Sequence, residues 1–170
     1  MLYYRDFLII PGEDQAFVLS ALWRALHAHQ RATGAQLVSV PVKHDRRARQ
    51  VMLAEKGQLA DGFRVFAQDQ KALEIALDPY VEDAVQAKQS KTEEPSDTHC
   101  IVVRRVYVLE ERKRRKKGQI FINPEWTQYF WHKKDNGLFR YYIYVKQDNK
   151  KCAFISQNTF GCGSVPVKLQ

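Results

Sequence analysis

Two histidines in the first predicted helix are the residues whose chemistry is easiest to state. A histidine titrates near neutral pH, so either one can act as a general base toward a hydroxyl, including a ribose 2′-hydroxyl. Successive helical residues turn by about 100°, which puts His29 in the apolar stripe of Leu22 and Leu26 and puts His27 almost opposite, beside Arg24. Single histidines are commonly structural, so the spacing alone assigns neither residue a catalytic role.

A run of six consecutive cations is the second feature, and it lies inside the chain. Adjacent cations repel one another, and phosphates relieve this repulsion and release counterions, so binding weakens steeply with salt. Arginine also makes bidentate contacts to phosphate or to a guanine edge. The alternative is a solvated loop without a ligand. Because basic and aromatic strand residues precede the run, we expect it to bind a polyanion; the residues are Arg112, Lys113, Arg114, Arg115, Lys116 and Lys117, preceded by Arg104, Arg105 and Tyr107.

The net charge of the chain is confined to its second part. Residues 1–90 carry 11 Lys/Arg and 11 Asp/Glu, whereas residues 91–170 carry 16 and 8, so the whole net charge of +8 belongs to the latter. A surface that only serves solubility would spread its charge. The concentration therefore favours a polyanion-binding face in the second half.

Aromatic residues are interleaved with these cations. A nucleic-acid base can stack on such a ring, and each stacked base contributes about 1–3 kcal/mol to the binding free energy. Alternation along a strand turns about half of the rings inward, so one or two are expected to meet a ligand. The candidates are Trp126, Tyr129, Phe130, Trp131, Phe139, Tyr141, Tyr142 and Tyr144.

Several classes of protein are disfavoured by what the sequence lacks. It contains no HExxH, no GxSxG, no Walker loop and no paired-carboxylate spacing, so no metal or other cofactor is expected. Cys100, Cys152 and Cys162 form no CxxC pair, so they are expected to be reduced thiols without a disulfide or zinc. Apolar runs are too short to span a membrane and the first residues do not form a signal peptide, which indicates a cytoplasmic protein.

The first half is predicted to be a ferredoxin-like βαββαβ domain, over residues 1–88. Two helices would cover one face of an antiparallel sheet and leave the other face free for a partner. Pro41 should stop the second strand and Pro79 should end the second helix. The expected strands are residues 2–10, 37–40, 62–67 and 84–88, with a weak strand at 49–55, and the expected helices are 13–33 and 69–78.

The second half is predicted to follow a polar linker, residues 89–98, and to be a basic, β-rich, degenerate ferredoxin-like domain over residues 99–170. Residues 147–150 should close a hairpin between strands 138–146 and 151–157. A strand is also expected over 100–109, another over 119–122, a short helix over 124–130, and a glycine-rich turn over 160–166. The fold class is therefore α+β.

The order of several segments resembles that of the CRISPR-associated repeat endoribonucleases of type I-F systems. The resemblance spans nearly the whole chain and rests on spacing and order, with no single decisive motif. It is carried by residues 22–27 (LWRALH), 37–41 (LVSVP), 59–67 (LADGFRVFA), 71–77 (KALEIAL), 103–107 (VRRVY), the cationic run, 137–143 (GLFRYYI) and the late GSVP.

The resemblance implies a metal-independent nuclease that binds one CRISPR repeat hairpin and cleaves at its 3′ base, leaving a 2′,3′-cyclic phosphate and a 5′-hydroxyl. Family enzymes often stay bound to the guide RNA as a subunit of a surveillance complex used in antiviral defence, and no direct DNA contact is implied. The family's general base matches His27 and its stem-capping ring matches Phe139. Its groove-reading residues match Arg105 and, less well, Tyr107, and its arginine-rich helix matches residues 112–117, with Arg104 and Arg140 as further RNA contacts.

Three departures from the family pattern leave an alternative open. The basic helix is short, because Gly118 follows it directly, and the family's serine before the Phe-Arg strand and its tyrosine on a late strand are missing. His132, Lys133 and Lys134 occupy the region of that serine and are candidates to stabilise the pentavalent phosphate. The alternative is a non-catalytic or weakly catalytic subunit that caps the guide RNA hairpin. A plain ferredoxin-like interaction module is the third hypothesis.

Overall fold

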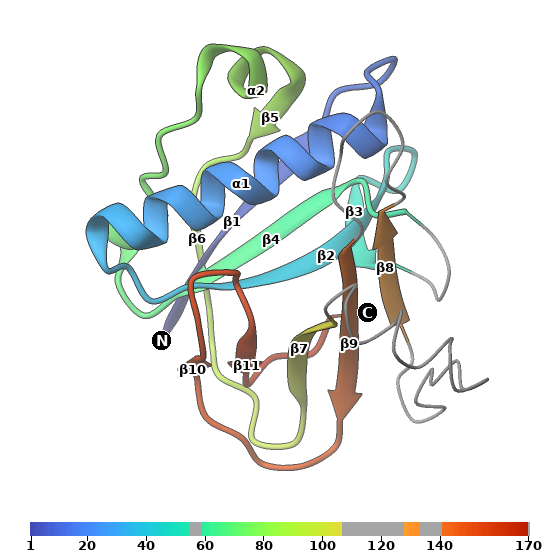
Figure 1. Ribbon diagram of the computed structural model, residues 1–170. Helices are drawn as coiled ribbons and strands as arrows, with labels where there is room; N and C mark the ends of the chain where they lie inside the picture. The colour runs from blue at the N-terminus through green and yellow to red at the C-terminus, as the bar shows by residue number, and fades with distance from the viewer. Residues whose placement is uncertain (55–58, 107–127, 133–140, 170) are drawn as a thin grey trace, which may run out of the picture.

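The computed structural model describes residues 1–54, 59–106, 128–132 and 141–169, with only the backbone at 105–106, 128–132 and 141–144. Two antiparallel sheets make up most of the molecule (Figure 1). The first half forms a six-stranded sheet in the order β3-β2-β4-β1-β5, with β6 also paired to β1. Its elements are β1 (Leu2–Ile9), α1 (Gln15–Thr33), β2 (Val38–Asp45), β3 (Gln50–Leu53), β4 (Gly62–Ala67), η1 (Gln70–Leu73), α2 (Pro79–Ala84), β5 (Val85–Ala87) and β6 (Lys91–Glu93).

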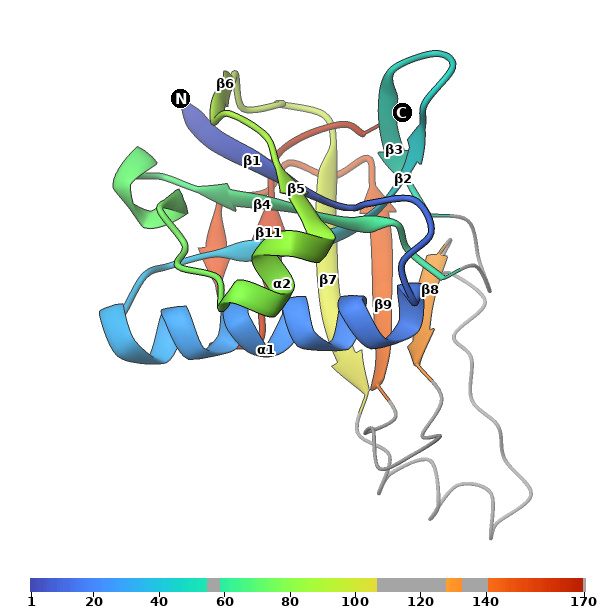
Figure 2. The ribbon, with the colours of Figure 1, turned by 90° about the horizontal axis from the view of Figure 1, so that it is seen from above.

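This strand order confirms the predicted ferredoxin-like arrangement. β4 and β1 are central, β2 and β5 flank them, and the β2–β3 hairpin extends one edge. The helices α1 and α2 lie on the same face of the sheet (Figure 2), where Phe17 of α1 meets Tyr80 of α2 edge to face at 5.4 Å between ring centroids. The opposite face is left to the second sheet and to solvent.

Local signals explain why α1 forms where it was predicted. The Asp14 carboxylate accepts a hydrogen bond from the Phe17 amide and caps the first turn. Gly34 ends the helix in the left-handed conformation, at φ 70°, and its N–H bonds the Gln30 carbonyl. The apolar stripe, including Leu22 and Leu26, is buried against the sheet.

The predicted second helix is wrong in position. Residues 70–73 form only a single 3-10 turn, and the α-helix begins at Pro79, the residue that was expected to end it. Proline suits the first helical position because its missing N–H needs no partner there. Asp78 provides the cap, since its carboxylate accepts from the Val81 amide at 3.0 Å.

Pro41 does not stop the second strand either, because β2 runs on to Asp45. Pro41 pairs with Phe63 of β4 in the ladder. The carbonyl of the next residue, Val42, points toward β4 and accepts from the Asp61 amide, so the nitrogen of Pro41 faces the other edge of β2. On that edge β3 pairs only from Val42 onward, so no ladder bond is lost.

The second half forms a five-stranded sheet in the order β10-β11-β7-β9-β8. Two predictions for it are wrong. Residues 128–130, the end of the helix predicted over 124–130, lie in strand β8. The predicted hairpin between residues 138–146 and 151–157 is absent from the ladder, because both edges of β9 are taken by β7 and β8 and β10 pairs with β11 instead. The strands are β7 (Cys100–Val106), β8 (Gln128–His132), β9 (Tyr141–Asp148), β10 (Ile155–Ser156) and β11 (Gly163–Val165).

One hydrophobic core joins the two sheets. Ile101, Val103, Val145 and Val165 are almost fully buried in the same cluster as the core of the first half. The segment predicted as a linker contributes β6, which pairs with residues 2–4 of β1. No helix in the described parts of the chain is long and apolar enough to cross a membrane.

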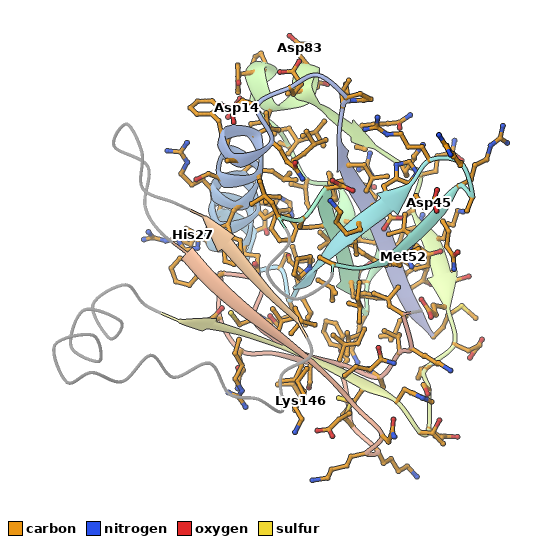
Figure 3. All side chains as sticks on the ribbon, turned by 90° about the vertical axis from the view of Figure 1, so that its right-hand side faces the viewer. Asp14, His27, Asp45, Met52, Asp83 and Lys146 are labelled. Carbon is orange, nitrogen blue, oxygen red and sulfur yellow. A yellow bond between two sulfur atoms is a disulfide. The ribbon has the colours of Figure 1, made fainter. Side chains whose placement is uncertain are left out.

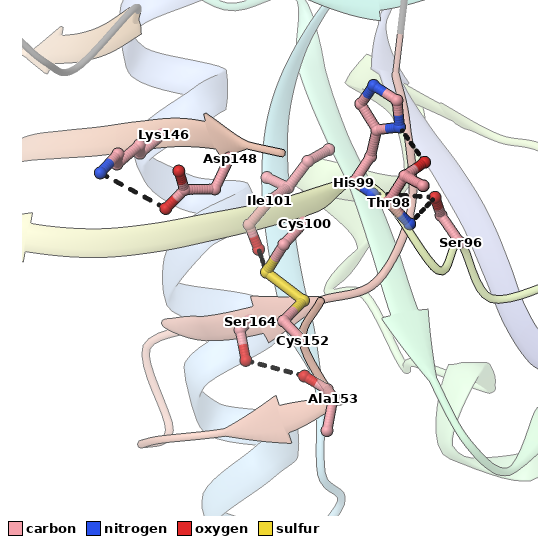
Figure 4. Close-up of a disulfide and its surroundings, with 10 residues drawn as sticks. All are labelled: Ser96, Thr98, His99, Cys100, Ile101, Lys146, Asp148, Cys152, Ala153 and Ser164. Atoms are coloured by element: carbon pink, nitrogen blue, oxygen red, sulfur yellow. Dashed lines mark hydrogen bonds and ion pairs between the residues drawn. A yellow bond between two sulfur atoms is a disulfide. The ribbon is translucent and has the colours of Figure 1, made fainter. Parts of the chain in front are cut away.

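The expectation of three reduced thiols is wrong for two of them. Cys100 at the start of β7 forms a disulfide with Cys152, which follows β9 (Figure 4). The spacing of the cysteines could not reveal this pair, because the two meet only when β7 and β9 align with Cys100 opposite Asp148. Cys162 is buried and lies outside the disulfide.

Candidate active site

His27 lies on the side of α1 that faces away from the first sheet (Figure 3). Its ring is half-buried and makes two contacts with the loop between β10 and β11, residues 157–162. Nδ1 lies 2.8 Å from the carbonyl oxygen of Thr159. The ring also stacks on Phe160, with 4.1 Å between centroids and 5° between planes. These two contacts fix both the position and the plane of the imidazole.

The loop that holds His27 is itself tightly bonded. The side-chain carbonyl of Asn158 accepts from the Phe160 amide at 2.9 Å, and the Gln157 amide donates to the Cys162 carbonyl at 2.9 Å. Gln30, buried one turn after His27 on α1, donates to the Asn158 carbonyl at 3.3 Å. The loop therefore reaches α1 as an ordered turn.

A glycine lets the loop approach the first sheet closely. The amide of Ser39 on β2 donates to the Gly161 carbonyl at 2.9 Å. Gly161 has φ +74°, and a Cβ at this position would come within 2.6 Å of the Ser39 side chain. The glycine is required here both for its backbone conformation and for the space.

The Thr159 carbonyl determines which nitrogen of His27 can act as a base. A carbonyl oxygen only accepts, so Nδ1 carries the proton and donates it to Thr159. In the neutral ring, Nε2 then holds the lone pair and can accept a proton from a hydroxyl. The same arrangement of a carbonyl behind an imidazole orients histidines in many catalytic and metal sites.

The other histidines on described side chains have different surroundings. His29 bonds the Ala72 carbonyl at 3.2 Å through Nε2 and ties α1 to η1, in agreement with its place on the inner stripe. His99 contacts the neighbouring Thr98 hydroxyl. His44 lies on the far sheet face, where burial, followed by Lys88 and Arg46, lowers its pKa.

Arg104 is exposed on β7, opposite Tyr144 of β9. It lines a shallow cavity of about 320 Å³ beside the disulfide, together with Lys150 and Lys151. Its lining includes these three cations and one carboxylate, Asp148, so the hollow has a positive net charge. The side chain of Arg104 is therefore open to solvent at a hollow with a positive net charge, and its role as an RNA contact stays a prediction.

The remaining predicted site residues are placed only in part. Arg105 and His132 lie on strands, where they pair with Ile143 and Tyr141. The others lie outside the described residues: Tyr107, Arg112, Lys113, Arg114, Arg115, Lys116, Lys117, Lys133, Lys134, Phe139 and Arg140.

Sequence reasoning missed the two residues that hold His27. Phe160 was predicted only as the start of a glycine-rich turn, and Thr159 was assigned to no element. Nothing in their spacing signals a contact with a helix that ends 126 residues earlier than Thr159, at Thr33. The signal that existed was the glycine-rich turn itself, a pattern that permits close backbone approach. Within the described residues, no group of three His, Cys, Asp or Glu side chains could hold a metal ion.

Comparison with known proteins adds little beyond these observations. No protein-family model matches the sequence, and no curated protein matches it. Two solved structures of the CRISPR endoribonuclease Cse3 bound to a 19-nucleotide RNA align with TM-scores of 0.41 and 0.38, at 9% and 10% identity, over 95% and 96% of this chain and 95% and 97% of those chains. Thermus thermophilus Cse3 bound to an RNA representing a pre-cleavage complex aligns with a TM-score of 0.39 and 10% identity, over 95% of this chain and 96% of that one. All three TM-scores lie below 0.5, so the likeness carries no weight in assigning a function.

Proposed function

We propose that the chain is a metal-independent endoribonuclease that binds a CRISPR repeat hairpin and cleaves it at the 3′ base of the stem. The observation that carries this proposal is the hydrogen bond from His27 Nδ1 to the Thr159 carbonyl, which leaves Nε2 as a proton acceptor. The resemblance to the type I-F repeat endoribonucleases supports the substrate and the subtype. The concentration of charge in residues 91–170 supports a polyanionic ligand.

The reaction needs one proton acceptor and a geometry for in-line attack. His27 Nε2 removes the proton of the 2′-hydroxyl, the 2′-oxygen bonds to phosphorus, and the bond from phosphorus to the 5′-oxygen breaks. The products are a 2′,3′-cyclic phosphate and a 5′-hydroxyl, whose oxygen takes its proton from Lys133, Lys134, His132 or water. The same three side chains would stabilise the pentavalent phosphate.

The stem is held by cations and stacking in this proposal. Phe139 caps the base of the stem, Arg105 and Tyr107 read the groove, and Arg104 and Arg140 contact the backbone. The cationic run at residues 112–117 neutralises phosphates. These contacts keep the 2′-oxygen, phosphorus and 5′-oxygen in line, and such positioning provides much of the rate. The protein then stays on the guide RNA as a subunit of a larger complex, in the cytoplasm where the transcript is made.

The second candidate is a hairpin-binding subunit without cleavage. It is favoured by the surroundings of His27, which makes no hydrogen bond to a charged side chain among the described residues. A base without a described acid partner is compatible with weak or absent catalysis.

Incubating the pure protein with its repeat RNA in EDTA separates the two candidates. We expect one discrete cut, with a cyclic phosphate on the 5′ product, and a single-turnover rate that falls by about 10²–10⁴ in His27→Ala. Hairpin affinity should stay within about tenfold, since the imidazole acts on the transition state. An intact RNA bound tightly at every pH would leave the capping subunit as the function.

A further inference from the structure

A cavity of about 600 Å³ opens on the face of the first sheet opposite α1, away from the proposed active site. Its floor includes Tyr4 and Arg64. Figure 3 places Asp45 and Met52, on the hairpin that borders this cavity, on the opposite side of the molecule from His27. Hairpin cleavage by His27 does not use this surface.

Cations reach the cavity from both rims. Arg46 and Arg49 come from the turn between β2 and β3, and Lys88 and Lys91 come from the segment around β5 and β6. None of the four has an ion pair with any residue that the structure describes. Residues 1–90, which include three of these four cations, carry no net charge, so a cluster of cations that no described residue pairs on one face marks a surface suited to an anion.

A buried ion pair forms part of the floor of the cavity. The Arg64 guanidinium makes two hydrogen bonds to the Asp6 carboxylate, at 2.7 and 2.8 Å, and both side chains are about nine-tenths buried. The guanidinium also lies over the Tyr4 ring at 4.3 Å from its centroid. Because this pair neutralises itself, the net charge of the cavity comes from the rims, with half-buried Glu93 of β6 as the nearby carboxylate.

Arg49 holds an unusual backbone conformation for its residue type. Its φ is +53°, in the left-handed region that favours glycine. The Asp45 carboxylate holds the turn by accepting from the amides of Arg47 and Ala48. The turn therefore presents an arginine at a position where glycine would be less strained.

A second hollow, of about 550 Å³, adjoins the first and shares Leu8, His44 and Arg46 with it. Its other walls are largely apolar, including Ile10 and Pro11. A ligand that spans both hollows would place negative groups between the cationic rims and flat apolar groups next to them. A single nucleic-acid strand has this alternation, with phosphates at its backbone and bases to one side.

We propose that these two hollows bind a single strand of RNA, with its phosphates between Arg46/Arg49 and Lys88/Lys91. This inference goes beyond the hairpin nuclease and does not depend on it. The site recognises backbone charge and a base face, without hydrogen bonds that would select a sequence.

The test measures binding of a single-stranded 2′-O-methyl oligouridylate of about ten nucleotides, which has no hairpin and cannot be cleaved. The variant is Arg46→Gln with Arg49→Gly, because glycine adopts the φ of residue 49 more readily than arginine does and so preserves the turn. The matched control, Arg31→Gln with Lys71→Gln, removes two exposed cations from α1 and η1.

Each lost phosphate contact reduces the slope of log K against log salt by about 0.7, so the variant should lose about 1.4 in slope and roughly twentyfold in affinity at 0.1 M salt. The control should bind as the wild type does, and a 4-thiouridine oligomer should crosslink to the peptides that carry Tyr4 and Lys88. Equal losses in both variants, crosslinks confined to the second half, or equal displacement by an oligoglutamate of the same charge would each overturn the proposal. Cleavage of the repeat hairpin, measured in parallel, tests the nuclease separately.

Discussion

The Nδ1 atom of His27 lies 2.8 Å from the carbonyl oxygen of Thr159, although 132 residues separate them in the sequence. This hydrogen bond links the first helix to the loop between the last two strands. It assigns the proton to Nδ1 and leaves Nε2 to accept one.

Replacing Phe160 with leucine should slow cleavage without weakening hairpin binding. Leucine keeps apolar burial but removes the flat surface on which the His27 ring stacks. A loosely held imidazole spends less time in line with its hydroxyl. We therefore expect the single-turnover rate to fall by a factor of about ten at most. Phe154→Leu is the matched control, because Phe154 packs on the core and has no stacking contact with His27. Equal rates in the two variants would contradict the positioning role.

Gly161→Ala should be more destabilising than Gly34→Ala. The two glycines have nearly the same φ, +74° and +70°, so each substitution incurs the left-handed penalty of about 1–2 kcal/mol. At Gly34 no atom lies within 4 Å of the added Cβ, whereas at Gly161 the Ser39 side chain lies at 2.6 Å. Crowding should add about 1–3 kcal/mol to the loss in free energy of unfolding. Urea denaturation of both variants measures the difference, and identical midpoints would show that the loop does not pack as described.

Reduction of the Cys100–Cys152 disulfide should lower the free energy of unfolding. The bond closes a loop with a sequence separation of 52 residues, for which chain entropy gives about 4 kcal/mol. The Tm of the wild type should therefore fall in dithiothreitol, and the Tm of Cys100→Ser with Cys152→Ser should not respond to the reductant. A wild-type Tm that is unchanged by dithiothreitol would mean that the two thiols stay reduced in solution.

Acidification should destabilise the fold through His44. Burial lowers the pKa of His44 below its ordinary value of 6.5, as do Lys88 and Arg46, while Asp61 and Asp6 act in the opposite direction. The unfolded chain therefore binds this proton more readily than the folded protein does, so stability falls as the pH drops below about 6.5 toward the folded pKa. His44→Gln should remove this part of the pH dependence of the free energy of unfolding. Lys88→Met should remove a smaller part, and an unchanged slope in His44→Gln would contradict the assignment.

Local features of the sequence were enough to predict much of the first half. Asp14 and Gly34 bound α1 through hydrogen bonds that span only a few residues, and the apolar stripe follows from helical periodicity. Alternating residues predicted β4 with its observed limits. The boundaries that were predicted wrongly in this half involve prolines, which are compatible with more than one local structure. Pro79 begins a helix as readily as it ends one, and Pro41 is tolerated where a strand edge has no partner.

Only the tertiary structure decided the contacts that give these elements a function. The sequence by itself determined that His27 and His29 point apart, that the excess of positive charge lies in residues 91–170, and that a glycine-rich turn comes late, since each of these can be read from the order of residues along the chain. It could not determine that Thr159 and Phe160 hold His27, that Cys100 bonds Cys152, or that Arg46 and Lys88 border the same cavity. Such contacts depend on which strand edges are already paired and on how two sheets share one core. Neither can be predicted from the local pattern of residues.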